Sequence, residues 1–401
     1  MAFFDVDKLR EKYGNFVRPK ALLEIDGKNF DKNKLGLSIS DIEIELSAGY
    51  EASIASFVIY NAFDVNNSKF KVEDLKKVIM LGSAIKLGVG YANSAIYVFN
   101  GFVSKINFTY DGETATPGVE ITAMDAKGIM MANNHSRQLK ADNYGDAVRE
   151  IFDEPLYSTM ENSGIITGKI LSDTPDKSPA PASSGSRKAS DKTIEIVGES
   201  DYEFVVKAAK KFNYDFFVHL GKIVFRRAKD TKDVLIDLAP DSKIIRSLNV
   251  EYDISGIVGS VEARGMNTAD GKVISATEKA NNKLSLGNKA KALIKSSEKV
   301  YIDTTIQSDT DAKNRAASLM EMISYRFGTI ECTTMGLPDL MPGYFIDLSG
   351  VGTAVSNRFY LTTVKHRLDG SGKGFSTTFY GKAASLSDSM AGAIGGMGGL
   401  F

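Results

Sequence analysis

The stretch Gly336-Leu-Pro-Asp-Leu-Met-Pro-Gly-Tyr-Phe-Ile-Asp-Leu348 combines two glycines and two prolines with alternating apolar residues. Pro338 and Pro342 restrict the backbone, and Gly336 and Gly343 permit the turns that such a stretch needs between strands. The flanking residues alternate between apolar and polar, which is the period of a half-buried strand. This part of the chain therefore predicts antiparallel β structure. Short strands are expected at 328–335, 343–348, 358–367 and 374–380.

A second strand-rich region lies between residues 18 and 135. Segments such as Ile42-Glu-Ile-Glu-Leu46 alternate cleanly, and Asp111-Gly112 is a turn signal between two strands. One or two helical turns are expected at 72–77. Many short strands at this spacing are typical of an antiparallel barrel or sandwich. The expected strands are 21–27, 42–46, 55–60, 85–91, 97–103, 105–110 and 118–124.

Helical spacing appears between the two strand-rich regions. Residues 144–152 carry apolar side chains at helical intervals and stop before Pro155. In the next helix, 199–212, Ser200 is a candidate N-cap with Glu203 three residues later, which is the capping-box pattern. Strands at 214–220 and 222–227 are expected to follow as a hairpin, and further strands at 244–252 and 257–264.

Two polar stretches interrupt this pattern. Residues 172–192 contain three prolines and a Ser-Ser-Gly-Ser run, a composition that buries little surface, so a mobile loop is expected. Residues 267–299 are rich in Lys, Asn and Ser and are expected to form a long surface excursion. A helix is expected at 309–325.

The sequence thus predicts a mainly β protein with α+β insertions. The predicted units are an N-terminal segment (1–17), a first β-barrel domain (18–135), a mixed α/β domain (136–235), a second β-barrel domain (236–382) and a Gly-rich C-terminal tail (383–401).

Composition excludes several classes of function. The net charge of −1 gives no reason to expect nucleic acid or an anionic membrane as partner. Cys332 is the only cysteine, so neither an intrachain disulfide nor a cysteine-based zinc site is expected. The charged first twelve residues do not resemble a signal peptide, and no run of about 20 apolar residues is present. We therefore expect synthesis in the cytoplasm.

No constellation of residues points to catalysis. His135, His219 and His366 lie in three separate segments, so none has a second histidine at metal-ligand spacing. G-x-S-x-G and G-x-x-x-x-G-K-[ST] motifs are absent, and the chain has no Trp. We expect no catalytic, cofactor-binding or metal-binding residues. A pair of carboxylates at glycosidase separation remains an open alternative.

Three stretches resemble the baseplate hub family that includes the phage late control protein D and the N-terminal half of the type VI secretion protein VgrG. The strongest is Gly336–Leu348 with the strands 358–366 and 374–380, where Tyr360 and His366 are expected to be packing or hydrogen-bonding positions. The others are the helix and hairpin from Ser200 to Phe225, and Val261-Glu-Ala-Arg-Gly265 with Gly271. The resemblance covers nearly the whole chain, from about residue 18 to residue 382.

The resemblance implies two barrel domains shaped like the tube subunit, plus smaller α/β domains. It implies a homotrimer whose six barrels match a hexameric tail tube and which joins that tube to a central spike and other baseplate proteins. VgrG continues into an oligonucleotide-fold domain and a β-helical spike, whereas this chain stops. The protein would be assembled into a phage tail or contractile injection particle. Two other classes stay open, a tail-tip cell-wall or polysaccharide hydrolase and a secreted adhesin.

The C-terminal tail allows two interpretations. Residues 390–401 are uncharged and Gly-rich, as a frayed terminus can be. Apolar residues in a solvated tail would expose apolar surface, however, so the alternative is an arm that orders only by docking on the spike or on neighbouring hub subunits. The candidate docking residues are Ile394, Met397, Leu400 and Phe401.

Overall fold

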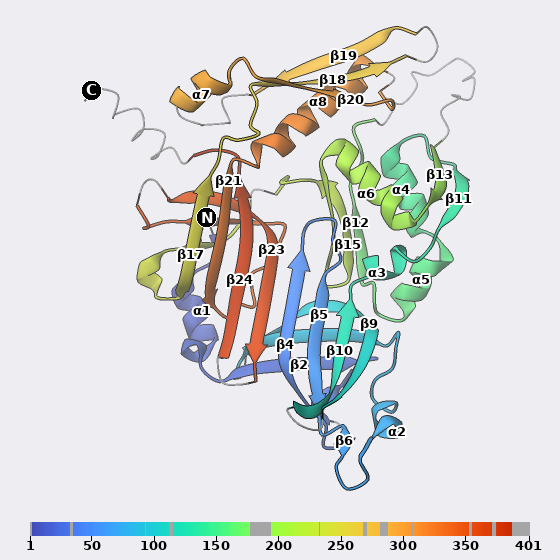
Figure 1. The fold of residues 1–401 in the computed structure, drawn as a ribbon, viewed down its shortest axis with the longest axis vertical. Coiled ribbons are helices and arrows are strands. Elements are labelled where there is room, and N and C mark those ends of the chain that lie inside the picture. Colours follow the sequence, from blue (N-terminus) through green and yellow to red (C-terminus); the bar gives the residue numbers. More distant parts are fainter. Residues whose placement is uncertain are drawn as a thin grey trace.

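Strands from both strand-rich regions form one continuous 14-stranded sheet in the computed structural model (Figure 1). The structure describes residues 2–32, 35–92, 94–111, 115–176, 194–231, 233–267, 271–280, 288–306, 308–352, 355–370 and 374–386. Along the sheet the order is β1 (Ala2–Phe4), β16 (Val234–Leu238), β22 (Phe345–Leu348), β23 (Asn357–Asp369), β4 (Ser38–Ser47), β5 (Ile54–Tyr60), β10 (Ala115–Met124), β9 (Ser94–Asp111), β8 (Ala84–Tyr91), β2 (Pro19–Ile25) and β3 (Lys28–Asn29). A branch leaves β23 through β24 (Gly374–Ala383) and β21 (Gly328–Met335) to β17 (Ile245–Tyr252).

The mainly β class with α+β insertions is confirmed. The two predicted barrels, however, are joined where β4 pairs with β23 in antiparallel register, from Ile42↔Leu368 to Ser47↔Thr363. Pairing among the described strands closes neither region into a barrel. The sequence could not show this junction because the paired strands lie more than 300 residues apart.

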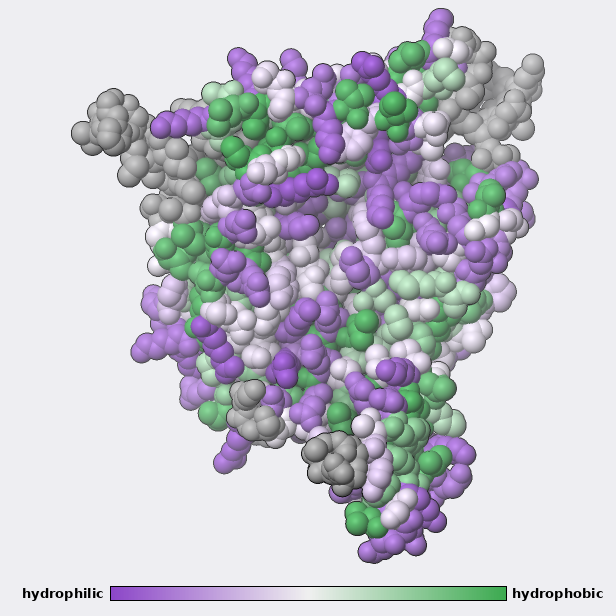
Figure 2. All heavy atoms as spheres, in the orientation of Figure 1, coloured by the Kyte–Doolittle hydropathy of each residue, from purple (hydrophilic) through white to green (hydrophobic). Residues whose placement is uncertain are grey.

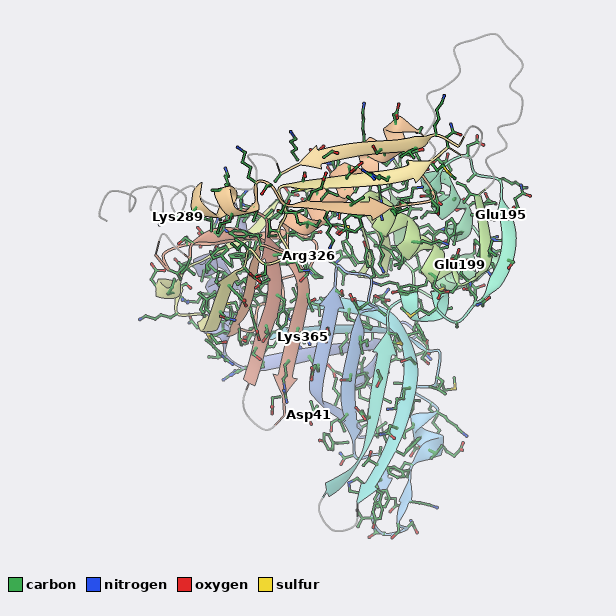
Figure 3. The ribbon with its side chains drawn as sticks, turned by 45° about the horizontal axis from the view of Figure 1, so that its top comes forward. Asp41, Glu195, Glu199, Lys289, Arg326 and Lys365 are labelled. Atoms are coloured by element: carbon green, nitrogen blue, oxygen red, sulfur yellow. The ribbon has the colours of Figure 1, made fainter. Side chains whose placement is uncertain are left out.

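One face of the sheet forms the main core and the other is polar. Alternating side chains such as Ile44 on β4 and Phe57 on β5 are fully buried. On the opposite face, the Lys365 ammonium pairs with the Glu45 carboxylate across β23 and β4 at 2.9 Å. Figure 2 shows purple and pale side chains over these strands, and Figure 3 labels Lys365 and Asp41 beside them. This is the pattern of an antiparallel sheet with one solvated face.

The 136–235 region forms an α/β unit beside the sheet. The capping box predicted at Ser200 and Glu203 is confirmed, with both reciprocal hydrogen bonds present. Pro155 is the first residue of a further helix rather than only the end of the preceding one. The unit begins before residue 136, because Met130 packs in its core. Its elements are α3 (Lys127–Met130), β11 (His135–Leu139), α4 (Tyr144–Phe152), α5 (Pro155–Asn162), β12 (Gly168–Leu171), β13 (Ile194–Glu199), α6 (Asp201–Phe212), β14 (Tyr214–His219) and β15 (Lys222–Arg227).

A small sheet covered by α8 lies at the top of the molecule in Figure 1. It contains β18 (Ser260–Met266), β19 (Val273–Lys279) and β20 (Glu298–Ile302), which pack on α8 (Asp309–Ser324), with α7 (Asn288–Ile294) nearby. The polar stretch 267–299 is therefore not a plain surface excursion. Exposed and half-buried positions alternate along β19, and most of its exposed residues are polar.

The remaining elements are short. Strands expected at 97–103 and 105–110 form the single strand β9, because a bulge rather than a turn accommodates Ser104 between them. The N-terminal segment is folded rather than separate: β1 pairs with β16, and α1 (Val6–Lys12) follows it. Also present are α2 (Val72–Leu75), β6 (Phe63–Asp64), β7 (Lys69–Phe70) and the 3-10 turns η1 (Gly14–Phe16), η2 (Phe30–Lys32) and η3 (Pro240–Ser242).

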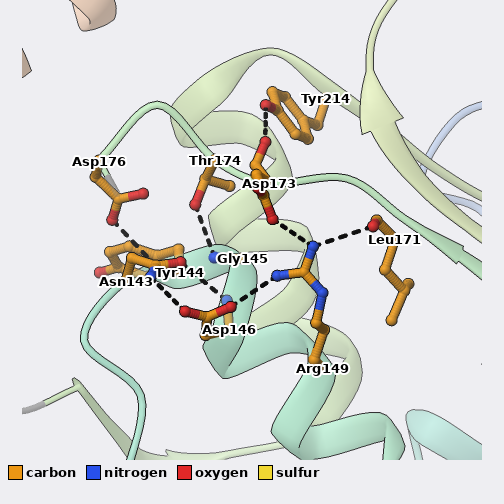
Figure 4. A network of polar contacts seen from close by, with 10 residues as sticks. All are labelled: Asn143, Tyr144, Gly145, Asp146, Arg149, Leu171, Asp173, Thr174, Asp176 and Tyr214. Atoms are coloured by element: carbon orange, nitrogen blue, oxygen red, sulfur yellow. Dashed lines mark hydrogen bonds and ion pairs between the residues drawn. The ribbon is translucent and has the colours of Figure 1, made fainter. Parts of the chain in front are cut away.

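The first residues of the predicted mobile loop are anchored to α4 (Figure 4). The Gly145 N–H donates to the Thr174 hydroxyl at 2.7 Å, and the Arg149 guanidinium binds the Asp173 carboxylate at 2.6 Å. The Tyr144 N–H donates to the Asp176 carboxylate at 3.1 Å. Residues 172–176 thus belong to the folded α/β unit, and the rest of the predicted loop, 177–192, lies outside the described residues.

Limited proteolysis should separate these two parts. With trypsin we expect the first cuts at Lys177, Arg187, Lys188 or Lys192, because the Pro- and Ser-rich composition of residues 177–192 does not favour a packed structure. A protease of broad specificity should give the same first fragments and leave 172–176 intact. First cleavage within 328–348 would contradict the domain organisation, and mass spectrometry of early fragments distinguishes the outcomes.

Candidate functional site

The glycine- and proline-rich stretch forms the connection between β21 and β22. Both of its prolines and both of its glycines are buried. The Gly336 N–H donates to the Phe375 carbonyl at 3.0 Å, and the Leu337 N–H donates to the Thr377 hydroxyl at 2.8 Å. These two backbone N–H groups lie in the loop, and their hydrogen bonds hold the loop against β24.

Gly336 is required by the packing of an aromatic ring. A Cβ atom at this position would lie 2.0 Å from Cδ1 of Phe375, far inside van der Waals contact. Its carbonyl also accepts a hydrogen bond from the Tyr91 hydroxyl at 3.1 Å. The glycine thus allows the loop to lie directly against the aromatic core.

We expect Gly336→Ala to destabilise the protein by about 3 kcal/mol, because the Phe375 ring must leave its position to make room. The matched control is Gly168→Ala, where the nearest atom is Cγ of Lys222 at 3.8 Å, an ordinary contact. Urea denaturation measures both changes. A loss below about 1 kcal/mol for Gly336→Ala would show that the loop shifts freely.

Gly343 connects the loop to the α/β unit. Its φ of +86° is in the region that favours glycine. Its carbonyl accepts a hydrogen bond from the Arg226 guanidinium at 2.6 Å, and a Cβ there would lie 2.8 Å from Cζ of Phe217. Both contacting residues belong to the β14–β15 hairpin, so the loop and the hairpin pack directly.

Tyr360 on β23 makes a second link to the same hairpin. Its hydroxyl donates to the Asp215 carboxylate, and both side chains are buried. Burial raises the pKa of Tyr360, and the nearby Asp215 carboxylate raises it further. Burial also raises the pKa of Asp215, against the hydrogen bond from Tyr360 and the charge of Lys229. The Tyr360 hydroxyl is therefore a protonated donor at neutral pH.

Asp339, between the two prolines, binds the N-terminal segment. Its carboxylate accepts hydrogen bonds from the Tyr13 hydroxyl at 2.6 Å and from the Lys12 ammonium at 2.8 Å. Burial raises the pKa of Tyr13, and the hydrogen bond to Asp339 adds to the effect. The ring of Tyr13 lies 5.7 Å from that of Tyr91. The first helix is thereby fixed to a loop more than 300 residues away.

His366 is fully buried beside the same cluster. Its Nδ1 lies 2.9 Å from the Thr377 hydroxyl oxygen, and its ring lies 6.0 Å from that of Phe375. Burial lowers the pKa of His366 to about 4. The imidazole is therefore neutral at neutral pH, and its environment is that of a packed core residue.

Two cavities flank the junction between the sheet, the α/β unit and α8. They have volumes of about 440 Å³ and 240 Å³, and Lys229 and Tyr325 line both. The Lys229 ammonium lies 4.4 Å from the centre of the Tyr325 ring, and burial lowers its pKa. In the part of the chain that the structure describes, no three His, Cys, Asp or Glu side chains are placed to hold a metal ion.

The structure brings Gly336, Pro338, Pro342 and Gly343 into one loop, with Tyr360 and His366 on the adjoining β23. Sequence analysis missed the partners of these residues. The sequence carries no local signal for these contacts, because Tyr13 is more than 100 residues from Asp339, as Asp215 is from Tyr360 and Arg226 from Gly343, so only the fold brings them together. The proposed docking residues of the C-terminal tail, Ile394, Met397, Leu400 and Phe401, lie outside the described residues.

Solved structures of bacterial and prophage tail proteins share this architecture. A tail protein from Neisseria meningitidis MC58 superposes with a TM-score of 0.62 and 13% identity, covering 93% of this chain and 99% of that one. The chain has the fold of a phage tail protein. The 43 kDa tail protein of prophage MuSo2 from Shewanella oneidensis gives a TM-score of 0.62 with 14% identity, covering 90% of this chain and 98% of that one.

A type VI secretion protein shares the fold at a lower score. The E. coli c3393 protein, described as structurally similar to the T4 bacteriophage tail proteins gp27 and gp5, gives a TM-score of 0.53 and 11% identity. The match covers 90% of this chain and 76% of c3393.

The sequence itself resembles known families only in part. A family model described as the Alg8 N-terminal domain matches residues 185–370, which is less than half of the chain and does not define its family. No curated protein matches the sequence. Among the described residues, no helix is long and apolar enough to cross a membrane.

Proposed function

We propose that the chain is a non-enzymatic structural subunit of a tail baseplate. In this role it is the hub: three copies form a ring that joins a hexameric tail tube to a central spike and contacts other baseplate proteins. It is made in the cytoplasm and assembled into a phage tail or contractile injection particle, without binding nucleic acid or inserting into a membrane.

The observation that carries the proposal is the fold shared with the Neisseria tail protein over 93% of this chain and 99% of that one. The packing is also suited to transmitting force. Buried contacts from Asp339, Gly343 and Tyr360 fasten the N-terminal helix and the α/β unit to the sheet. Such contacts favour a rigid body.

Light scattering on the full chain, alone and mixed with tube and spike proteins from the same gene neighbourhood, tests the proposal. We expect a particle of three times 43.5 kDa that binds both partners. A chain that stays monomeric at micromolar concentration with both partners present overturns the hub assignment.

A turnover assay on peptidoglycan and polysaccharide tests the non-enzymatic part. We expect no product above the blank. Turnover that disappears on replacing a specific carboxylate would instead establish a tail-tip hydrolase.

A further inference from the structure

The large sheet has two long strand edges that are unpaired within the described residues. β17 pairs with β21 on one side only. β9 pairs with β8 through residues 94–102 and with β10 through residues 102–111, so the second half of β9 is open on the β8 side. Figure 1 shows β17 at the left of this run of strands and the lower part of β9 at the right. Open edges of this length present free N–H and C=O groups to another strand.

The backbone of β17 shows which residues face its open edge. The Asp253 N–H donates to the Phe327 carbonyl at 2.8 Å, on the β21 side. Because hydrogen-bonding direction alternates along an antiparallel strand, Glu251 and Asn249 also bond toward β21. Val250 and Leu248 therefore direct their backbone groups to the open edge.

The same argument applies to β9. The Val103 N–H donates to the Ser83 carbonyl at 2.9 Å, away from β10. Lys105 pairs with Thr122 whereas Val103 pairs with Ala123, so Ser104 is an extra residue in the strand. A one-residue bulge shifts the alternation by one. Ile106 and Phe108 therefore direct their backbone groups to the open edge of β9.

These directions permit an antiparallel pairing in which Val250 lies opposite Ile106 and Leu248 lies opposite Phe108. Val250, Leu248 and Ile106 all pack on the main core in their own sheet. The pairing would thus continue the core-side face from one sheet to the next. It would also cover Phe108, which is 43% exposed.

The polar face matches in the same register. Glu251 falls opposite Lys105, and both side chains are exposed. Asn249 falls opposite Asn107, and Ser247 opposite Thr109. A shift of two residues would separate the two opposite charges, and a shift of one would place polar side chains on the core-side face.

We infer that β17 of one copy pairs with the second half of β9 of the next copy, in this register. The inference rests on the proposed function, because the pairing of β17 with β9 would be the contact that builds the proposed ring. The two edges differ, so the contact is head-to-tail and each copy offers one of each edge. Such contacts close into a ring when the rotation between copies permits it.

Disulfide trapping tests the register. Asn107 and Asn249 would form a non-hydrogen-bonded pair with Cα atoms about 4.5 Å apart, within disulfide reach. We expect the Asn107→Cys/Asn249→Cys chain to form covalent oligomers on mild oxidation of the assembled protein, in most subunits. The native Cys332 is buried and should not interfere. The matched control, Lys105→Cys/Ser247→Cys, is displaced by four residues and should remain uncrosslinked.

A charge exchange provides an independent readout. Lys105→Glu places like charges opposite each other and should raise the concentration needed for assembly about tenfold. Adding Glu251→Lys should restore assembly. An oligomer that forms without crosslinking through 107 and 249, or that crosslinks equally in the control, overturns this inference and leaves the hub proposal standing. A native chain that never assembles overturns both.

Discussion

Replacing Lys127 by alanine is expected to destabilise the protein by about 3–5 kcal/mol, the cost of removing one of two buried, opposite charges that interact. Lys127 is 0% exposed, and its ammonium donates hydrogen bonds to the carbonyls of Gly49, Glu51 and Phe216. The first two belong to the β4–β5 connection and the third to β14. The side chain therefore ties the large sheet to the α/β unit.

The loss of stability would come mainly from the buried Asp125 carboxylate, which is left without its opposite charge when the Lys127 ammonium is removed. Asp125 is also buried, and its carboxylate accepts hydrogen bonds from the backbone N–H groups of Ser53 and Lys127. Burial raises the pKa of Asp125, and the charge of Lys127 opposes that effect. Burial likewise lowers the pKa of Lys127, opposed by Asp125 and Glu51. Without the ammonium, the carboxylate must be buried alone or take up a proton.

Two variants separate charge from packing. Lys127→Met keeps most of the apolar stem and should lose nearly as much stability as the alanine variant, because the charge is what matters. Lys127→Met with Asp125→Asn should regain part of the loss. Lys76→Ala removes an exposed lysine paired with Glu73 and should change stability by about 0.5 kcal/mol or less. Urea midpoints measure all four, and a Lys127→Ala loss under about 1 kcal/mol would contradict the argument.

Local patterns predicted the elements whose determinants lie within a few residues. The helix at α6 follows from a cap and an apolar stripe, and the strand predicted at 328–335 has the same bounds as β21. The predicted end of the helix 144–152 before Pro155 is confirmed by α4, but α5 was missed because a proline that follows one helix can also be the first residue of the next. β19 was missed because its outward face is mostly polar, so composition hid the alternation.

The site was less predictable because its contacts are long-range. The glycine- and proline-rich loop between β21 and β22 was predicted because glycine and proline constrain the backbone locally. The acceptor role of Asp339 depends on Tyr13, and that of Asp215 depends on Tyr360; each pair is more than 100 residues apart in sequence. The continuity of the sheet through β4 and β23 is long-range for the same reason. Alternation of apolar and polar residues predicts that a segment is a strand, but it does not show which strand pairs with it.

The buried imidazole of His366 should make the protein lose stability as pH falls. Its pKa is about 4 in the folded chain, against 6.5 when unperturbed, because burial disfavours the charged ring. Below pH 6.5 the unfolded chain therefore binds a proton that the folded chain does not. The contribution of the neutral imidazole is complete above pH 6.5 and is lost progressively as pH falls toward 4. This difference in pKa between the folded and unfolded chain corresponds to about 3 kcal/mol of free energy of unfolding.

Other groups titrate in the same range, so the test compares two proteins. His366→Asn retains an amide near the Thr377 hydroxyl and cannot take up a proton. Between pH 7 and pH 4, the native chain should lose about 3 kcal/mol more stability than the variant, since contributions from His219 and the buried carboxylates of Asp125 and Asp215 cancel in the difference. Urea midpoints at half-unit pH steps measure both curves. Parallel curves would show that the imidazole is solvated in the folded protein, and the packing of Thr377 and Phe375 around it would then need revision.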